Sequence, residues 1–416
     1  MSSTTVCVVG LGYIGLPTAA ILASNGVDVI GVDINERTVE AVNRGDVPFV
    51  EPDLATYVAG AVTQGTLRAA TKPEQADAFI VAVPTPFTDG HKPDLSYIQA
   101  AAEAIAPHLS AEALVILEST SPPQATQQMA EWILAARPDL SLDGSEGRAR
   151  IHVAHCPERV LPGRVMIELV TNDRIVGGLT ADAAERAKEL YQVFCQGEIL
   201  LTDAVTAEMA KLVENSYRDV NIAFANELSL ISADLGIDVW ELIRLANHHP
   251  RVNILQPGPG VGGHCIAVDP WFIVDAAPER AQLIRTAREV NDGKPEYVIS
   301  RVKEHAERFK APRIAVLGLA FKPDIDDLRE SPALMIAVRL ANEIEHATVY
   351  AVEPHIDQLP TPLAGRPNVE LRHLGSAVNE ADIVLVLVDH TDFKQADSKP
   401  LRLREKIVID TKGVWR

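Results

Sequence analysis

The chain has 416 residues, of which 47% are hydrophobic, and a formal net charge of −19 from 38 basic and 57 acidic side chains. This length is too great for one compact core, so we expect two or three domains. An acidic surface repels phosphate backbones, which argues against nucleic acid as a partner.

The start of the sequence has no basic segment followed by an apolar one, so we expect no signal peptide. The densest apolar run, Ile383–Val388, is too short to cross a bilayer. The four cysteines are scattered and match neither a disulfide framework nor a metal site. We therefore expect a cytoplasmic protein that binds no metal and no membrane.

The first 200 residues alternate short apolar runs with alanine-rich helical stretches. Strands are expected at Val6–Val9, Val27–Val32, Phe79–Val83, Leu114–Leu117, Ile151–Ala154 and Arg174–Gly177. Alternation of strand and helix predicts a parallel, doubly wound sheet. We place this N-terminal domain at residues 1–200.

The segment Ala204–Leu235 contains strong helix formers and neither proline nor glycine, so it predicts one unusually long helix. A helix of this length commonly bridges domains or builds a subunit interface. Further helices are expected at Val239–Ala246 and Pro278–Phe309. Residues 201–311 are therefore expected to form a central helical domain.

The strand pattern begins again at Arg313–Gly318, a strand followed by a turn. Later strands are expected at Val349–Val352, Ile383–Val388 and Ile407–Ile409. This predicts a second α/β domain at residues 312–416, which lacks a glycine fingerprint like that of the first.

A glycine-rich turn follows the first expected strand. Gly10, Gly12 and Gly15 match G-x-G-x-x-G between a strand and a helix, the pattern that brings backbone amides to a pyrophosphate. Asp33, at the end of the second strand, suits the ribose hydroxyls of a dinucleotide. The acid favours NAD over NADP, although Arg37 lies nearby and is counted with the cofactor site.

The segment Pro257–Pro270 reads PGPGVGGHCIAVDP and holds Cys265 four residues before Asp269. A thiol in a glycine-rich loop with an acid nearby suggests covalent chemistry on a carbonyl carbon. Free cysteines are more often buried packing, and the other three are given that interpretation. His264 is treated as non-catalytic, because neighbours in a loop seldom face each other.

Lys211, Asn215 and Arg218 are spaced so that they share one face of the long helix. The spacing is compatible with a solvated polar face and, equally, with a cradle for an oxyanion or a phosphate. The residues alone leave both interpretations open.

Several long motifs resemble the UDP-glucose/GDP-mannose dehydrogenase family over nearly the whole chain. They are GLGYIGLP (10–17), VPTP (83–86), ESTSPP (118–123), CPERVLPGR (156–164), the stretch 207–227, the stretch 249–272 and GLAFKPDIDDLRESPA (318–333). The resemblance implies two Rossmann-like doubly wound domains joined by a long central helix and a helical middle domain. It also implies a homodimer through that helix.

The activity that the resemblance implies is a four-electron oxidation of a UDP-sugar C6 alcohol to the carboxylate with two NAD. Cys265 would be the nucleophile, Lys211 the acid/base and oxyanion-stabilising group, and Asn215 its partner on the helix face. Asp269 and Glu158 would be the acids near the hydrolytic water.

The resemblance also implies ligand contacts. NAD would be contacted, besides the glycines and Asp33, by Tyr13, Ile14, Thr85, Thr120, Thr126 and Arg329. The UDP-sugar would be contacted by Arg159, Val160, Lys211, Asn215, Arg218, His249, Arg251, Gly262, Phe321 and Lys322. Arg251 is expected to reach across a dimer interface.

The chain departs from the UDP-glucose branch at Pro162, where that branch has a glutamate, and at Val268, where it has a lysine. These departures leave open whether Asp269 or Glu158 activates the water. Residues Ala267–Trp271, near the end of the motif at 249–272, favour an N-acetylmannosamine sugar over its N-acetylglucosamine epimer, by resemblance alone.

Two other classes of protein are less compatible with the residues. A two-electron dehydrogenase of the 6-phosphogluconate type needs no thiol and would have no second α/β domain. A catalytically idle nucleotide-sugar-binding protein would be expected to lack Lys211, Cys265 or Asp269, and all three are present.

Overall fold

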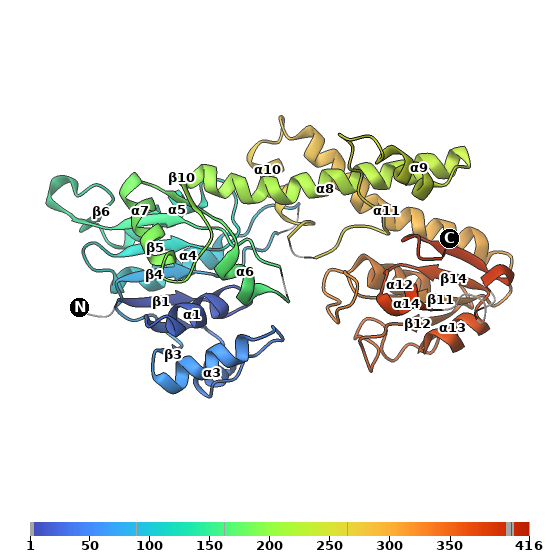
Figure 1. Cartoon of the computed structure of the whole chain (residues 1–416), viewed down its shortest axis with the longest axis horizontal. Helices are drawn as coiled ribbons and strands as arrows, with labels where there is room; N and C mark the ends of the chain where they lie inside the picture. Colours follow the sequence, from blue (N-terminus) through green and yellow to red (C-terminus); the bar gives the residue numbers. More distant parts are fainter. Residues whose placement is uncertain are drawn as a thin grey trace. The chain divides into compact units, whose positions relative to one another are not determined.

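The computed structural model describes residues 4–88, 90–161, 163–263, 265–396, 401 and 403–415. The chain forms two compact units. The first contains the residues up to Glu214 together with Trp271–Pro278, and the second contains Asn215–Pro270 and the residues from Glu279 onward. Each unit is built around its own mainly parallel sheet with helices packed on it (Figure 1), which confirms the predicted fold class.

The first unit holds a sheet in the order β10-β9-β8-β5-β4-β1-β2-β3. Its strands are β1 Thr5–Val9, β2 Asp28–Val32, β3 Leu67–Ala70, β4 Ala78–Val81, β5 Leu114–Leu117, β8 His152–His155, β9 Arg174–Gly178 and β10 Ile199–Asp203. Neighbouring strands are parallel except β8 and β9, which are antiparallel. β1 lies between β2 and β4, at the topological switch point where such sheets bind ligands.

Helices cover both faces of this sheet. They are α1 Gly15–Ser24, α2 Glu36–Asn43, α3 Leu54–Gln64, α4 Ser96–Ile105, α5 Ala125–Ala136, α6 Val165–Thr171 and α7 Ala181–Tyr191, with 3-10 turns at Ala106–His108 and Ser145–Gly147 and a small ribbon of β6 Leu140–Ser141 and β7 Ala149–Arg150. Side chains alternate along each strand. Val6 and Val8 of β1 therefore join one apolar core, while Cys7 and Val9 join the other.

The long helix α8 spans Ala204–Leu235, as predicted. It is followed by α9 Val239–Ala246, which also matches the prediction, and by α11 Gln282–Ala306, which is shorter than the predicted Pro278–Phe309. A helix that the sequence did not predict, α10 Asp269–Ala276, follows the cysteine loop. Proline at its second position is compatible with a first helical turn.

The second unit contains a five-stranded parallel sheet in the order β13-β12-β11-β14-β15. Its elements are β11 Arg313–Leu317, β12 Thr348–Val352, β13 Val369–Leu371, β14 Ile383–Val386, β15 Ile407–Asp410, α12 Pro332–Glu343, α13 Leu374–Glu380, α14 Thr391–Gln395 and a 3-10 turn at Leu403–Glu405. This is again a doubly wound arrangement with apolar cores on both faces. Within the described ranges, none of the helices combines the length and the apolar character that crossing a bilayer requires.

Candidate active site

The glycine-rich turn after β1 is shaped by close backbone packing. A Cβ atom at Gly15 would lie 1.8 Å from the carbonyl oxygen of Gly10, so only glycine fits there. Around Gly12, by contrast, no described atom lies within 4 Å of where a Cβ would stand, and Tyr13 beside it is partly exposed. Among the described side chains none caps the start of α1 at Ile14, so its amides can bind a phosphate.

Asp33 follows β2 and lies beside this turn. Its Oδ2 accepts the amide of Leu11 at 3.0 Å, and its Oδ1 accepts the amide of Asn35 at 2.8 Å. Each carboxylate oxygen can accept a second hydrogen bond, so the acid can still bind ribose hydroxyls. Arg37 is exposed at the start of α2. The turn and the acid together fit a dinucleotide.

The three predicted threonines follow strands on the other side of the switch point. The hydroxyl of Thr85, after β4, is buried and has no hydrogen-bond partner among the described residues. Such an orphaned hydroxyl is a polar position that a ligand can satisfy. Thr120, after β5, is half-buried. Thr126 is fully buried, and its hydroxyl donates to Glu208 at 2.6 Å.

Glu208 is a residue that the sequence interpretation missed. From α8 it accepts the amides of Gln124 at 2.6 Å and Thr126 at 2.8 Å, and thereby caps α5. Burial raises the pKa of its carboxyl, against the effect of the Thr126 hydrogen bonds. No local spacing could indicate this contact, because its partners lie far apart in the sequence.

The segment after β8 carries three predicted residues. Glu158 is buried, and its Oε1 accepts the amide of Arg159 at 2.5 Å. The side chain of Arg159 forms an ion pair with Glu214 of α8 at 2.6 Å, while Val160 packs against the core. Glu214 was not singled out from the sequence, although it adjoins Asn215.

Cys265 is exposed in the loop that leads into α10. Its carbonyl oxygen accepts the amides of Val268 at 3.1 Å and Asp269 at 2.8 Å. Asp269 is buried as the first residue of α10, and its Oδ2 lies 2.5 Å from the side-chain nitrogen of Asn215. One backbone turn therefore separates the thiol from a carboxylate–amide pair, and all of these residues belong to the second unit.

The predicted polar face of α8 is present in the helix. Lys211 and Asn215 are half-buried, and Arg218 is exposed. After α9, His249 and Arg251 are exposed, and the amide of Arg251 donates to Nδ1 of His249 at 3.3 Å.

The cysteine loop packs against the segment after β11. A Cβ at Gly262 would lie 2.4 Å from the carbonyl oxygen of Glu330, 2.5 Å from Pro332 and 3.3 Å from Phe321, which explains the glycine. A pocket lies beside this contact at the carboxyl ends of β11 and β14. Its lining includes Pro259, Gly260, Phe321, Lys322, Asp389 and Lys412.

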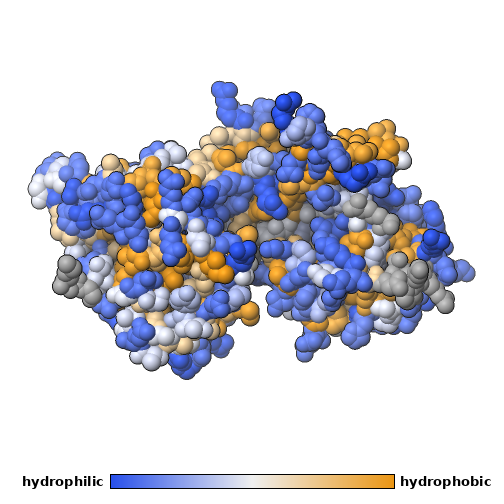
Figure 2. Space-filling view, viewed as in Figure 1, coloured by the Kyte–Doolittle hydropathy of each residue, from blue (hydrophilic) through white to orange (hydrophobic). Residues whose placement is uncertain are grey.

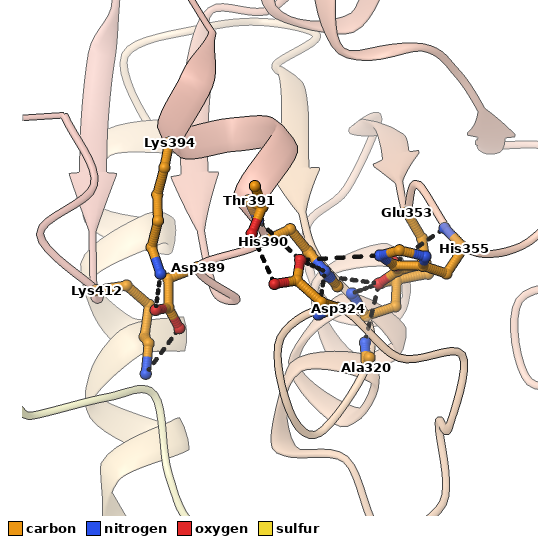
Figure 3. Close-up of polar contacts among 10 residues, drawn as sticks. Ala320, Asp324, Glu353, His355, Asp389, His390, Thr391, Lys394 and Lys412 are labelled. Atoms are coloured by element: carbon orange, nitrogen blue, oxygen red, sulfur yellow. Dashed lines mark hydrogen bonds and ion pairs between the residues drawn. The ribbon is translucent and has the colours of Figure 1, made fainter. Parts of the chain in front are cut away.

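Lys412 was not predicted. It follows β15, and its Nζ lies 3.3 Å from Oδ1 of Asp389, whose other oxygen pairs with Lys394 at 2.6 Å (Figure 3). The partly buried Asp389 therefore holds two lysines at the edge of the sheet, one of which lines the pocket. The sequence signal, a lysine just after the last strand, is too common to predict a binding residue.

A second polar group in Figure 3 surrounds Glu353, at the end of β12. Oε2 of Glu353 accepts the amides of Leu319 at 2.8 Å and Ala320 at 3.1 Å, and lies 3.1 Å from Nε2 of His390. Burial by itself raises the pKa of Glu353. The hydrogen bonds from His390 and from these two amides outweigh burial and hold this pKa below its usual range.

Asp324, His355 and His390 have side-chain ligand atoms within 4.8 Å of one another, as in a metal site. However, the amide of Asp324 donates to Nδ1 of His390 at 3.0 Å, and the proton on Nε2 faces Glu353. Both ring nitrogens of His390 are therefore engaged within the protein. The group is explained as a structural hydrogen-bond network rather than as a set of metal ligands.

Arg329, predicted to contact the cofactor, pairs with Asp327 through two nitrogens at 2.9 and 2.6 Å. Pro162 and His264, on which two further interpretations depended, lie outside the described residues.

Comparison with known families identifies all three parts of the chain. The UDP-glucose/GDP-mannose dehydrogenase family matches with its NAD binding domain at residues 4–195, its central domain at 205–293 and its UDP binding domain at 315–416.

Individual relatives cover the chain from end to end. The chain is 61% identical to an NDP-N-acetyl-D-galactosaminuronic acid dehydrogenase of Ralstonia nicotianae, over 99% of this chain and 96% of the relative. It is 56% identical to the UDP-N-acetyl-D-mannosamine dehydrogenase of Escherichia coli, over the full length of both. A solved structure of the UDP-N-acetyl-mannosamine dehydrogenase of S. aureus superposes with a TM-score of 0.86 at 43% identity, covering 99% of this chain and 96% of that one.

These matches agree with the glycine turn, the buried threonine hydroxyl and the acid that the first unit presents to a dinucleotide. The chain belongs to the UDP-glucose/GDP-mannose dehydrogenase family and is an NAD-dependent oxidoreductase that acts on a UDP-sugar.

Proposed function

We propose that the chain oxidises the C6 alcohol of UDP-N-acetyl-D-mannosamine to the carboxylate with two NAD. The full-length identity of 56% to proteins named for this activity supports the choice. The 61% identity to an N-acetylgalactosaminuronic acid dehydrogenase favours a second candidate, a nucleotide-linked N-acetylgalactosamine sugar. The N-acetylglucosamine epimer, the alternative open from sequence, differs only at C2.

One observation carries the proposal: the turn that places Cys265 four residues before Asp269 and its partner Asn215. Covalent oxidation of an aldehyde needs a thiol, a donor to the oxyanion and an acid that can activate water. The positive end of α10 additionally favours negative charge near Cys265. The loop thus brings together the residue types that this chemistry requires.

The proposed steps give each of these residues a chemical role. NAD, when bound, supplies the hydride acceptor for both oxidations. Lys211, directly or through a water, takes the proton of the sugar hydroxyl. Loss of this proton and of a hydride from C6 gives the aldehyde. The thiolate of Cys265 adds to the aldehyde carbon, and the resulting thiohemiacetal gives up a proton and a second hydride to become a thioester.

Lys211 and Asn215 stabilise the oxyanion at each tetrahedral stage. Water activated by Asp269 or Glu158 then attacks the thioester carbon, which breaks the carbon–sulfur bond and releases the acid and the thiol. Because the sequence has one glycine fingerprint, we infer that a single pocket serves both NAD molecules.

Ligand contacts in the proposal follow the matched motifs. Gly10, Gly12 and Gly15, with Asp33, would hold NAD, and the buried hydroxyl of Thr85 would complete the site. The remaining cofactor contacts would come from Tyr13, Ile14, Arg37, Thr120, Thr126 and Arg329. The UDP-sugar would be held by Arg159, Val160, Arg218, His249, Arg251, Gly262, Phe321 and Lys322.

The domain division at about residues 200 and 311, a cytoplasmic location and a homodimer through α8 complete the proposal. The three matched family ranges support the division.

The homodimer is supported by an apolar stripe that the second unit exposes on one face of α8. The stripe is made of Tyr217, Phe224, Ile231 and Leu235. Figure 2 shows apolar surface over the α8–α9 region.

The substrate is tested by measuring NADH release with UDP-N-acetylmannosamine, UDP-N-acetylglucosamine and UDP-N-acetylgalactosamine side by side. We expect the mannosamine sugar to give the highest kcat/KM, with about two NADH per sugar as four-electron oxidation requires. A yield near one would contradict the thioester scheme. A higher kcat/KM with either other sugar would reassign the substrate.

The role of the thiol is tested with Cys265→Ala. We expect this variant to keep its fold, as judged by circular dichroism, and to form no uronic acid, because no thioester can form. Cys195→Ala, at a half-buried cysteine outside the proposed site, is the matched control and should still form the acid. Acid formation by Cys265→Ala would make the thiol a bystander.

A further inference from the structure

Three ionisable residues meet in the interior of the first unit, where β5, β8 and β9 are neighbours. Glu118 is fully buried, and Glu158 and Arg174 are 7% and 3% exposed. Nη1 of Arg174 lies 3.8 Å from Oε1 of Glu118, and its Nη2 lies 3.7 Å from Oε2 of Glu158. We call these three residues the buried triad.

The strand register explains why the triad forms. Leu117 of β5 pairs with His155 of β8, so Glu118 leaves the sheet beside the segment that carries Glu158. His155 pairs with Gly177 of the antiparallel β9, which brings the start of β9, Arg174, back opposite that segment. The triad thus lies at the carboxyl ends of β5 and β8, the edge at which sheets of this kind bind ligands.

Among the residues that the structure describes, the contacts of the triad include no second cation that would balance both acids. Tyr191 donates its hydroxyl to Oε1 of Glu118 at 3.2 Å, and its ring lies 4.7 Å from the guanidinium of Arg174. A nitrogen of Arg174 also lies 3.7 Å from Sγ of Cys156. Burial raises the pKa of Cys156 to about 12 and that of Tyr191 well above its ordinary value, so both stay neutral.

One guanidinium can balance only one of two buried carboxylates, because burying an unpaired charge is costly. Burial, reinforced by the charge of Glu158, raises the pKa of Glu118 to about 8. Glu158 is the less buried of the two acids, and its Oε1 accepts a backbone amide at 2.5 Å. At neutral pH Glu118 therefore holds a proton, and the charge of Arg174 is left to face Glu158 at 3.7 Å.

We propose that Glu118 and Arg174 are positioning residues for Glu158. Arg174 can keep one of the two buried carboxylates ionised. Because Glu118 holds the proton, the ionised carboxylate is that of Glu158. The proposal rests on the proposed function, in which Glu158 is one of two acids that can activate the hydrolytic water. It favours Glu158 for that step, since a base must be ionised before it can accept a proton.

The protonation state is tested on the full chain without substrate, by infrared difference spectroscopy between pH 7 and pH 9. We expect the carbonyl band of a protonated carboxyl in the wild type at pH 7, its loss as the pH rises through about 8, and its absence from Glu118→Gln. A band that persists in Glu118→Gln and disappears in Glu158→Gln would overturn the proposal. Because no turnover is measured, this result is independent of the proposed activity.

The effect on chemistry is tested by the pH dependence of uronic acid release. In Arg174→Gln we expect the acid limb of the profile to move up by at least about one pH unit, a tenfold loss of rate on that limb. Arg174→Lys, which restores the charge, should recover most of the shift. An unmoved acid limb in Arg174→Gln would overturn the proposal.

The matched control is Arg288→Gln. Arg288 is 1% exposed and pairs with the buried Asp219 at 2.6 Å, in the second unit. Its loss should lower stability without moving the acid limb, which separates general destabilisation from an effect on Glu158. If Arg174→Gln does not fold, the infrared spectrum of Glu118→Gln and the pH profile of Arg174→Lys still test the proposal. A Glu118→Gln spectrum equal to that of the wild type would contradict it.

Discussion

At the residue scale, the cysteine loop owes its course to a single position without a side chain. Gly262 lies so close to Glu330 and Pro332 that a Cβ would overlap both. Gly258, in the same loop, has room, since the nearest atom to its Cβ position is Nζ of Lys412 at 3.7 Å. The two glycines therefore offer a matched pair of substitutions.

We expect Gly262→Ala to displace the loop and to lower both stability and sugar oxidation. Overpacking of this kind costs about 1–3 kcal/mol. Urea unfolding and the rate of NADH formation measure the two effects. Gly258→Ala should behave like the wild type, and equal behaviour of the two variants would show that the contact does not set the loop.

His155 gives a pH prediction at the same scale. Burial lowers the pKa of this imidazole at the end of β8 to about 3, below the 6.5 of an unfolded chain. The unfolded state therefore binds more protons between these values, so stability is full above pH 6.5 and is lost as pH falls towards 3.

We expect His155→Leu to remove this part of the acid sensitivity. The loss approaches about 1.4 kcal/mol per pH unit for one group. Urea unfolding at pH 7 and pH 5 should show a larger drop for the wild type than for the variant. Equal drops would mean that the imidazole is already protonated in the folded protein.

At the element scale, the sequence predicted regular elements better than the contacts between them. The helix α8 has its predicted bounds because Ala204–Leu235 contains neither proline nor glycine and Gly236 follows. In contrast, α10 was missed, because a glycine-rich loop precedes it and proline occupies its second position. The short edge strands β3, β10 and β13 were also missed, since their side chains are partly exposed.

The candidate site shows the same division. The glycine turn and Asp33 are local patterns, and the structure places them side by side as expected. The pairs Asn215–Asp269, Arg159–Glu214 and Thr126–Glu208 join distant segments, so spacing along the chain could not indicate them. The resemblance to known motifs could single out individual residues of these pairs, but only the structure shows which residue contacts which.

Glu208 provides the prediction for this scale. Glu208→Ala would leave the partly buried amide of Gln124 and the buried amide of Thr126 without this acceptor, at a cost of about 1–3 kcal/mol. Chemical denaturation should therefore show a lower midpoint. Glu189→Ala, at an exposed position of α7, should change the midpoint little, and a midpoint of Glu208→Ala equal to that of this control would contradict the capping role.

At the scale of the whole molecule, the apolar stripe on α8 matters most. Exposed apolar side chains recur there at intervals of seven and four residues, which is the spacing of one helical face. On a chain with a net charge of −19, such a stripe is an unusual surface and fits a second copy of the same helix.

If the chain dimerises through this stripe as proposed, we expect Phe224→Glu to give a monomer, because the substitution would bury a charge in the interface. Analytical ultracentrifugation measures the change in mass. Leu283→Glu changes an equally apolar side chain, 70% exposed on α11 outside the stripe, and should leave the mass unchanged. A Phe224→Glu variant that keeps the wild-type mass would show that the stripe is not the interface.

His390, which hydrogen-bonds to the carboxylate of Glu353, limits how this protein could be redesigned. Building a phosphate-binding turn after β11 would not by itself create another dinucleotide site, since Oε2 of Glu353, the acid placed to bind a ribose, already accepts three hydrogen bonds from within the protein. An engineer would first have to replace His390 and then rebuild the loop that it anchors through Asp324.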